Sequence, residues 1–275
     1  MKSFSQKRFF ITGAASGIGR QLARSFAERG ARLFLTDIDE TGLKRLTHEP
    51  AFSGRDVFLA RLDVSSLARW KTVFRQALRK LDGIDVILNV AGYLAPGYVH
   101  EFDPREVNRH FDINIKGVVY GTRLAAEHMV GAGSGHIINI ASMAGLAPVP
   151  GIALYSASKF AVRSFSLAAA MELETRGVHV TVICPDPVQT PMLDRQAAFP
   201  EAALTFSAPR YLTVEQIEGA VHRALTRPVY EIILPGYRGL LAKFASFAPA
   251  LAPPLGRLFT RIGLRNQSRY RSETK

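Results

Sequence analysis

The chain contains a single cysteine, Cys184, among 275 residues. One cysteine excludes a disulfide framework within the chain and a cysteine-rich metal centre, and we predict no metal site. Cys184 ends the apolar run from Val180, so we expect a buried, inert thiol. The sequence also lacks an internal repeat and a low-complexity tract, and neither its composition nor its motifs indicate a second domain.

Long apolar segments are absent as well. The run Phe9–Ile11, which follows Lys2, Lys7 and Arg8, is too short for a signal peptide, so we expect a cytoplasmic protein. Near the C-terminus, Lys243 and the prolines at 249, 253 and 254 exclude a membrane-spanning helix.

The charge is unevenly distributed. Of the net +12, residues 236–275 carry +7, from eight basic residues against Glu273 alone. A hydrophobic content of 47% argues against disorder and allows a substantial core. We therefore divide the chain into a globular domain, residues 1–235, and a basic, partly apolar C-terminal tail, residues 236–275.

Short apolar runs alternate with longer helical patterns, which is typical of a doubly wound α/β fold with helices on both faces of a parallel sheet. The segment Asp186–Tyr211 has no clear period, and we expect it to be an unstructured lid. About seven strands are predicted, at Arg8–Thr12, Arg32–Thr36, Val57–Leu62, Val86–Asn89, His136–Ile140, Val178–Ile183 and Glu231–Leu234. Helices are predicted near Ile18–Arg29, Ser66–Leu81, Glu106–Val130, Tyr155–Thr175 and Val214–Thr226.

A glycine-rich segment, Thr12–Gly19, joins the first predicted strand to the first helix. Glycines at such a turn let the backbone approach a pyrophosphate at the helix N-terminus, which predicts nucleotide binding. Asp37, after the second strand, can accept a hydrogen bond from a ribose 2′-hydroxyl and would repel a 2′-phosphate. Capping of the next helix is the alternative role for Asp37, although Asp39 could fill it. We therefore expect NAD in preference to NADP.

Tyr155 and Lys159 are four residues apart in a predicted helix and thus share a face. An adjacent ammonium favours the ionised form of a phenol, so we expect a tyrosine that exchanges protons near neutral pH. Ser142 follows the strand His136–Ile140 and should lie at the carboxyl edge of the sheet, where ligands bind. The Tyr155–Lys159 spacing alone is weak evidence for a catalytic pair. It gains weight because the same chain carries the glycine-rich segment Thr12–Gly19.

Taken together, residues from Arg8 to Leu234 resemble the short-chain dehydrogenases/reductases, which have a Rossmann-like fold. The resemblance implies that Ser142, Tyr155 and Lys159 are catalytic and that Ser142 and Tyr155 also contact the substrate. It implies that Asn114 orders a water linking Lys159 to solvent. The cofactor residues that it implies are Gly13, Ser16, Gly17, Ile18, Gly19, Asp37, Asp63, Val64, Asn89, Ala91, Gly92, Tyr155, Lys159, Val188 and Thr190.

Two positions depart from the family pattern. Val90 replaces a second asparagine after Asn89, a change that we expect to be mild. Asp186 replaces the glycine that usually follows Pro185. Its carboxylate would either add a charge beside the nicotinamide or point into solvent, and we expect the latter.

The substrate is less well defined by the sequence. Candidate pocket walls are mostly apolar, which predicts a lipophilic alcohol or ketone, such as a steroid, retinoid, long-chain or terpenoid compound. The alternatives are an NADP-dependent carbonyl reductase and a non-catalytic NAD-binding regulator. The wall residues are Met143, Val149, Tyr93, Tyr98, Met192 and Phe199.

The tail allows three interpretations: a segment lying on anionic lipid, a flap on the substrate mouth or a neighbouring subunit, or simply solvated charge. Nucleic-acid binding is not expected, because no reader motif and no interleaved stacking aromatics accompany the basic residues. The resemblance implies a homodimer or homotetramer formed through the helix Tyr155–Thr175.

Overall fold

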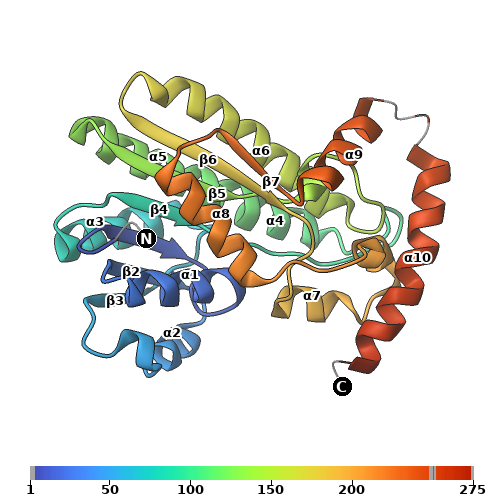
Figure 1. The fold of residues 1–275 in the computed structure, drawn as a ribbon, viewed down its shortest axis with the longest axis horizontal. Coiled ribbons are helices and arrows are strands. Elements are labelled where there is room, and N and C mark those ends of the chain that lie inside the picture. The colour runs from blue at the N-terminus through green and yellow to red at the C-terminus, as the bar shows by residue number, and fades with distance from the viewer. Residues whose placement is uncertain (1–3, 248–249, 251, 274–275) are drawn as a thin grey trace.

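The computed structural model describes residues 4–247, 250 and 252–273. Lys2, Pro249 and Lys275, which enter the sequence predictions, lie outside the described residues. Seven parallel strands form one sheet in the order β3-β2-β1-β4-β5-β6-β7, and helices cover both of its faces (Figure 1). The predicted doubly wound, Rossmann-like fold is confirmed. The strands are β1 (Arg8–Thr12), β2 (Arg32–Asp37), β3 (Val57–Arg61), β4 (Val86–Asn89), β5 (Gly135–Ile140), β6 (Val178–Pro185) and β7 (Glu231–Leu234).

The sheet is buried on both faces, because its strands direct apolar side chains to each side. β1 is an example. Phe9 and Ile11 pack with Leu22 and Phe26 of one layer, whereas Phe10 packs with the opposite layer. The first layer comprises α1 (Gly17–Glu28), α2 (Glu40–Leu46) and α8 (Val214–Thr226). The second comprises α3 (Leu67–Leu81), α5 (Gly117–Ala132) and α6 (Ala153–Glu174).

The helix predicted at Glu106–Val130 is divided into three parts. α4 (Arg105–His110) leads into a π-helical turn, η2 (Phe111–Lys116), and α5 follows. This turn contains Asn114, and π-helical turns often occur at functional sites.

The prediction of an unstructured lid at Asp186–Tyr211 is wrong. That segment contains α7 (Pro191–Gln196) and a 3₁₀ helix, η4 (Pro200–Ser207). Each begins with a proline, which is favoured at the first helical position because its missing N–H would have no partner there. The prolines thus start these helices.

The C-terminal tail forms two helices, α9 (Gly236–Phe247) and α10 (Ala252–Glu273). α10 packs along η4 and α9 contacts β7, and both tail helices lie at one end of the molecule (Figure 1). In the part of the chain that the structure describes, no helix is long and apolar enough to cross a membrane. The tail is thus folded, and α10 lies against the body of the protein.

Candidate active site

The glycine loop after β1 is a backbone cradle in which side chains have no room. Gly13 (φ +69°) and Gly17 (φ +52°) adopt left-handed conformations that favour glycine. A Cβ on Gly13 would lie 2.9 Å from the Ala91 backbone, and one on Gly19 would collide with the Gly13 carbonyl oxygen. Such a cradle, at the N-terminus of α1, fits the pyrophosphate of a dinucleotide.

A threonine joins this loop to the one after β4. Thr12 Oγ1 accepts hydrogen bonds from the backbone N–H groups of Val90 (3.0 Å) and Ala91 (3.1 Å). The predicted residues Ala91 and Gly92 therefore lie beside the glycine loop. Thr190, after β6, reaches the same loop: its Cγ2 would be 3.1 Å from a Cβ on Gly17.

Asp37 does not cap a helix. Its carboxylate accepts hydrogen bonds from the N–H groups of Ala15 (2.9 Å), within the glycine loop, and Asp39 (3.0 Å). Asp39 caps α2 instead, through the Gly42 N–H. Asp37 is thereby held at the end of β2, against the loop that would bind the cofactor.

The remaining cofactor candidates occupy the same edge of the sheet. Asp63 accepts hydrogen bonds from the N–H and hydroxyl of Ser65 and so shapes the turn after β3. Asn89 donates to Asn139 (2.8 Å) within the core. Ser16 precedes α1 without capping it through its side chain. Val64 and Val188 are buried, and Ile18 packs in the same apolar cluster as Val188.

The structure brings Ser142, Tyr155 and Lys159 together. Ser142 follows β5, and the other two side chains lie in the first turns of α6, with the Lys159 Nζ 5.6 Å from the centre of the Tyr155 ring. The ammonium donates to the Ile140 carbonyl (2.9 Å), which holds it below the end of β5. Tyr155 lies in a small apolar cluster with Ala144 and Ile152.

Burial dominates the acid–base behaviour of this pair when no cofactor is bound. It raises the pKa of Tyr155 to about 12, although a side-chain hydrogen bond with Ser142 acts in the opposite direction. It lowers the pKa of Lys159 to about 8. The expectation of a phenol already activated by Lys159 is therefore not met in the protein alone, because desolvation disfavours the charged form of each group.

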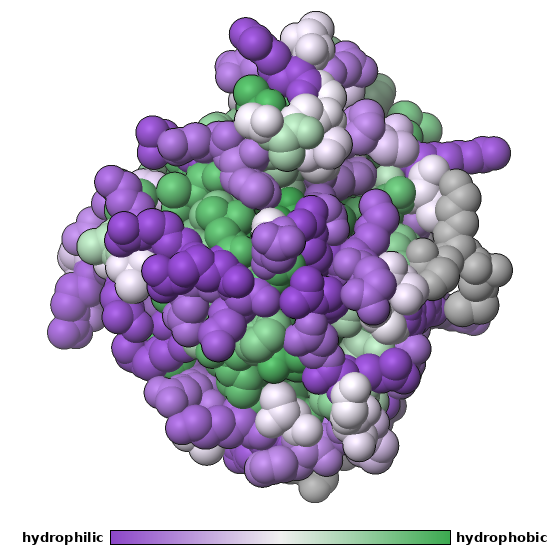
Figure 2. Space-filling model, turned by 90° about the vertical axis from the view of Figure 1, so that its left-hand side faces the viewer, coloured by the Kyte–Doolittle hydropathy of each residue, from purple (hydrophilic) through white to green (hydrophobic). Residues whose placement is uncertain are grey.

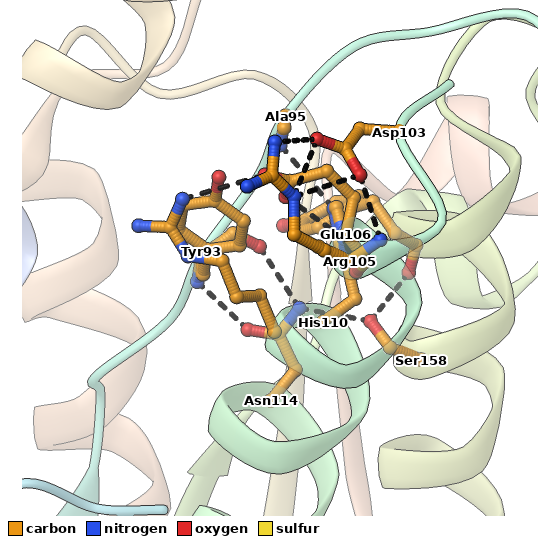
Figure 3. A network of polar contacts seen from close by, with 10 residues as sticks. Tyr93, Ala95, Asp103, Arg105, Glu106, His110, Asn114 and Ser158 are labelled. Carbon is orange, nitrogen blue, oxygen red and sulfur yellow. Dashed lines mark hydrogen bonds and ion pairs between the residues drawn. The ribbon is translucent and has the colours of Figure 1, made fainter. Parts of the chain in front are cut away.

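Asn114 is fixed by three hydrogen bonds in the π-helical turn (Figure 3). Its Oδ1 accepts from the Tyr93 N–H (2.7 Å), and its Nδ2 donates to the Tyr93 carbonyl (2.9 Å) and to Ser158 Oγ (2.9 Å). A Cβ at Gly92 would lie 3.6 Å from Asn114 Oδ1 and 3.8 Å from Lys159 Nζ. The amide oxygen and the ammonium thus approach the same stretch of backbone.

Two residues of this network carried no signal in the sequence. Ser158 links Asn114 to the Tyr155 carbonyl, to which its hydroxyl donates (2.7 Å). His110 is buried, its Nε2 accepts from the Ala95 N–H (3.2 Å), and its Nδ1 lies 2.7 Å from the Glu106 carbonyl oxygen (Figure 3). Burial lowers the pKa of His110, which favours the neutral ring that both contacts require.

The prediction that Asp186 points into solvent is wrong. Its side chain is buried and pairs with Arg238 of α9 (2.7 Å). Burial raises the pKa of this carboxyl to about 6, and Arg238 acts in the opposite direction. The residue that departs from the family pattern is thus a contact between the loop after β6 and the tail.

A cavity of about 500 Å³ opens between this loop and α10. None of the six predicted wall residues lines it, but Val149 packs on the Tyr155 cluster, and Leu94 lies there too. The lining of the cavity is mainly polar, and part of it comes from the tail. The lining residues are Gln189, Thr190, Pro191, Asp194, Tyr211, Tyr270 and Glu273.

A glycine cradle and a buried tyrosine–lysine pair on one sheet edge define a nucleotide-dependent oxidoreductase. Comparison with known proteins gives the family. A family model described as short chain dehydrogenase matches residues 7–200. The chain therefore belongs to the short-chain dehydrogenase/reductase family, whose dehydrogenases oxidise CH–OH groups to carbonyls, or reduce the carbonyls, with nicotinamide cofactors.

Relatives of known name are similar over most of their length. A 2,5-dichloro-2,5-cyclohexadiene-1,4-diol dehydrogenase of Sphingobium indicum is 37% identical over 66% of this chain and 73% of its own. A cyclopentanol dehydrogenase of Comamonas testosteroni is 32% identical over 77% and 85%. Among solved structures, a family member from Burkholderia phymatum in complex with NAD has a TM-score of 0.82 and 28% identity, covering 91% and 96%.

Proposed function

We propose that the protein is an NAD(H)-preferring dehydrogenase that interconverts a secondary alcohol and a ketone, or an alcohol and an aldehyde, on a lipophilic small molecule. The observation that carries the proposal is the position of the Tyr155 phenol. It lies in an apolar cluster, with Lys159 and Ser142 beside it.

In the direction of oxidation, Tyr155 acts as the base in its phenolate form, which the positive charge of Lys159 favours. Its Oη then takes the proton of the substrate hydroxyl, and Ser142 Oγ holds the reacting oxygen. Bound nicotinamide supplies the hydride acceptor, or the donor in reduction. Lys159 holds its charge below the phenol, and Asn114 orders a water that connects Lys159 to solvent. The proposed cofactor contacts are the residues that the family resemblance implies at the ends of β1 to β6.

Replacement of the phenol tests the catalytic role. Tyr155→Phe removes the hydroxyl that exchanges the proton, so we expect turnover to fall by about 10² to 10⁴, with NADH affinity retained. Tyr230→Phe is the control, because that exposed hydroxyl donates to Glu174 and lies at the other end of the sheet, before β7. Full turnover by Tyr155→Phe would contradict the proposal.

NAD preference is proposed from Asp37, whose carboxylate lies against the glycine loop. Neither Ser16 nor Ile38 supplies a positive charge for a 2′-phosphate. We expect NADH to bind more tightly than NADPH, and Asp37→Ala to narrow the difference. Asp39→Ala removes a nearby carboxylate that caps α2, and it should leave the ratio of NADH affinity to NADPH affinity unchanged. Equal affinities in the wild type would contradict the preference.

A lipophilic, alicyclic substrate is favoured by the apolar surroundings of Tyr155. Support comes from the names of similar proteins, which include cyclopentanol dehydrogenase and, at 37% identity, 3-alpha-(or 20-beta)-hydroxysteroid dehydrogenase of Mycobacterium bovis. The test follows nicotinamide absorbance with cyclic and steroid alcohols and NAD, and with the corresponding ketones and NADH. Faster turnover of short, polar alcohols would contradict this substrate class.

A cytoplasmic location, assembly as a homodimer or homotetramer through α6, and a peripheral lipid contact through the tail complete the proposal. Sedimentation of the purified protein tests the assembly.

A further inference from the structure

The helix α9 has its polar and apolar sides reversed with respect to a usual surface helix. Its two charged residues face the protein: Arg238 pairs with Asp186 (2.7 Å) and Lys243 with Glu231 (3.0 Å). On the same side, Gly239 is buried, and a Cβ there would collide with Ile233. Polar and close backbone contacts therefore anchor α9 to the sheet end.

The outward side of α9 is apolar. Leu240 is 72% exposed, Phe244 63% and Phe247 90%, with Tyr237 and Leu241 also exposed. Their spacing of three or four residues places them along one stripe of the helix, which we call the α9 apolar face. Contiguous exposed apolar surface on a helix marks a site of contact with a partner or a membrane.

The neighbouring helix α10 also packs on the protein through polar groups, but its arginines point outward. Gly263, Gln267 and Tyr270 face η4 and α7, where Gln267 donates to the carbonyls of Gln196 and Phe199 and the Tyr270 hydroxyl donates to Asp194. The outward side combines apolar and basic residues. Among the described residues, the exposed arginines of this helix form no ion pair at positions 257, 261, 265 and 269, and exposed apolar side chains lie between them at Leu258, Phe259, Ile262 and Leu264.

The charge of the tail distinguishes between possible occupants. A second copy docked through the same surface would bring two tails of net +7 together, which is unfavourable. An anionic lipid surface complements both properties, because apolar side chains enter the acyl boundary while arginines meet phosphate or carboxylate headgroups. α9 and α10 lie at the same end of the molecule (Figure 1), whereas the opposite end is mostly hydrophilic, with apolar atoms in patches between the polar ones (Figure 2).

We propose that the α9 apolar face and the arginines of α10 dock the protein on an anionic membrane surface. α9 is anchored through Arg238 to the loop after β6, which leads to Thr190, so the docked surface lies close to the active-site edge. The docking specifies the lipid contact that is part of the proposed function, and it does not depend on cofactor or substrate.

The test measures co-sedimentation with vesicles of phosphatidylcholine alone and of phosphatidylcholine with a quarter phosphatidylserine. We expect the wild type to bind the anionic vesicles and hardly the neutral ones. The triple variant Leu240→Ser, Phe244→Ser, Phe247→Ser should lose at least about tenfold in partition coefficient. Arg257→Gln with Arg261→Gln should lose roughly fivefold for each arginine. Val229→Ser, at the other end of β7, is the matched control for an exposed apolar residue.

Two outcomes would overturn the proposal. One is equal vesicle binding by the wild type and the triple variant. The other is a change of oligomeric state on triple substitution without vesicle binding by the wild type, which would make the face an interface between copies. NADH binding in solution, measured on the same variants, should be unchanged, so the result is separate from the fate of the proposed dehydrogenase activity.

Discussion

At the scale of single residues, Lys159 contributes to the site at the expense of the fold. Burial lowers its pKa from 10.5 to about 8, so an ammonium at pH 7 costs about 3 kcal/mol of stability. The folded pKa lies below the unfolded one, and between these values the unfolded chain binds more protons. Wild-type stability therefore rises with pH over that window, and the full cost is present below pH 8.

Lys159→Met should accordingly stabilise the protein at pH 7. It removes the buried charge and also the hydrogen bond to Ile140, worth about 1 kcal/mol, which leaves a net gain of about 2 kcal/mol. The gain should shrink between pH 8 and pH 10.5, as seen by urea unfolding at a series of pH values. Lys116→Met, at an exposed lysine paired with Asp112, should show no comparable gain. A gain that is constant with pH would contradict the assignment to Lys159.

At the scale of elements, the tail packs on the protein because the backbone of α10 comes close to the backbone of η4. Gly263 of α10 lies against η4, and a Cβ there would collide with the Ala203 carbonyl oxygen. Gly256 lies about two turns earlier in the same helix. A Cβ built on Gly256 would have no atom within 4 Å. Helix propensity alone predicts that alanine stabilises both positions by up to about 1 kcal/mol.

The two substitutions should therefore differ in sign. Gly256→Ala should stabilise slightly, whereas Gly263→Ala should destabilise by about 1–3 kcal/mol and expose the tail, because α10 must move away from η4. Urea unfolding measures the change in the free energy of unfolding, and limited proteolysis measures how far the tail is exposed. Equal gains at both positions would show that α10 does not pack on η4 as described.

Local signals explain which elements could be predicted from the sequence. The apolar run that forms β5 and the glycines after β1 carry their structure within a few residues, and the Tyr155–Lys159 spacing is itself helical geometry. The π-helical turn could not be predicted, since Asn114 bonds Tyr93 and Ser158, which are distant in sequence. The Asp186–Arg238 pair joins β6 to the tail, and no local pattern indicates it.

At the scale of the whole molecule, the candidate cofactor residues come from loops after most of the parallel strands. Gly13 follows β1, Asp37 ends β2, Ala91 follows β4, and Thr190 follows β6. A ligand that contacts all of these loops joins elements that otherwise meet mainly through the sheet. Its binding free energy should therefore appear as stability of the entire fold rather than of one loop.

Thermal unfolding with and without NADH measures this coupling. At 100 times its dissociation constant, NADH should add about 2.7 kcal/mol, which raises the Tm of a chain of this size by roughly 5 °C. Tyr155→Phe should show the same increase, because the phenol is proposed to act in proton transfer more than in holding the cofactor. Asp37→Ala should show a smaller increase at the same NADH concentration, since it removes the proposed ribose contact. An unchanged Tm with millimolar NADH and with millimolar NADPH would contradict nicotinamide binding at this edge of the sheet.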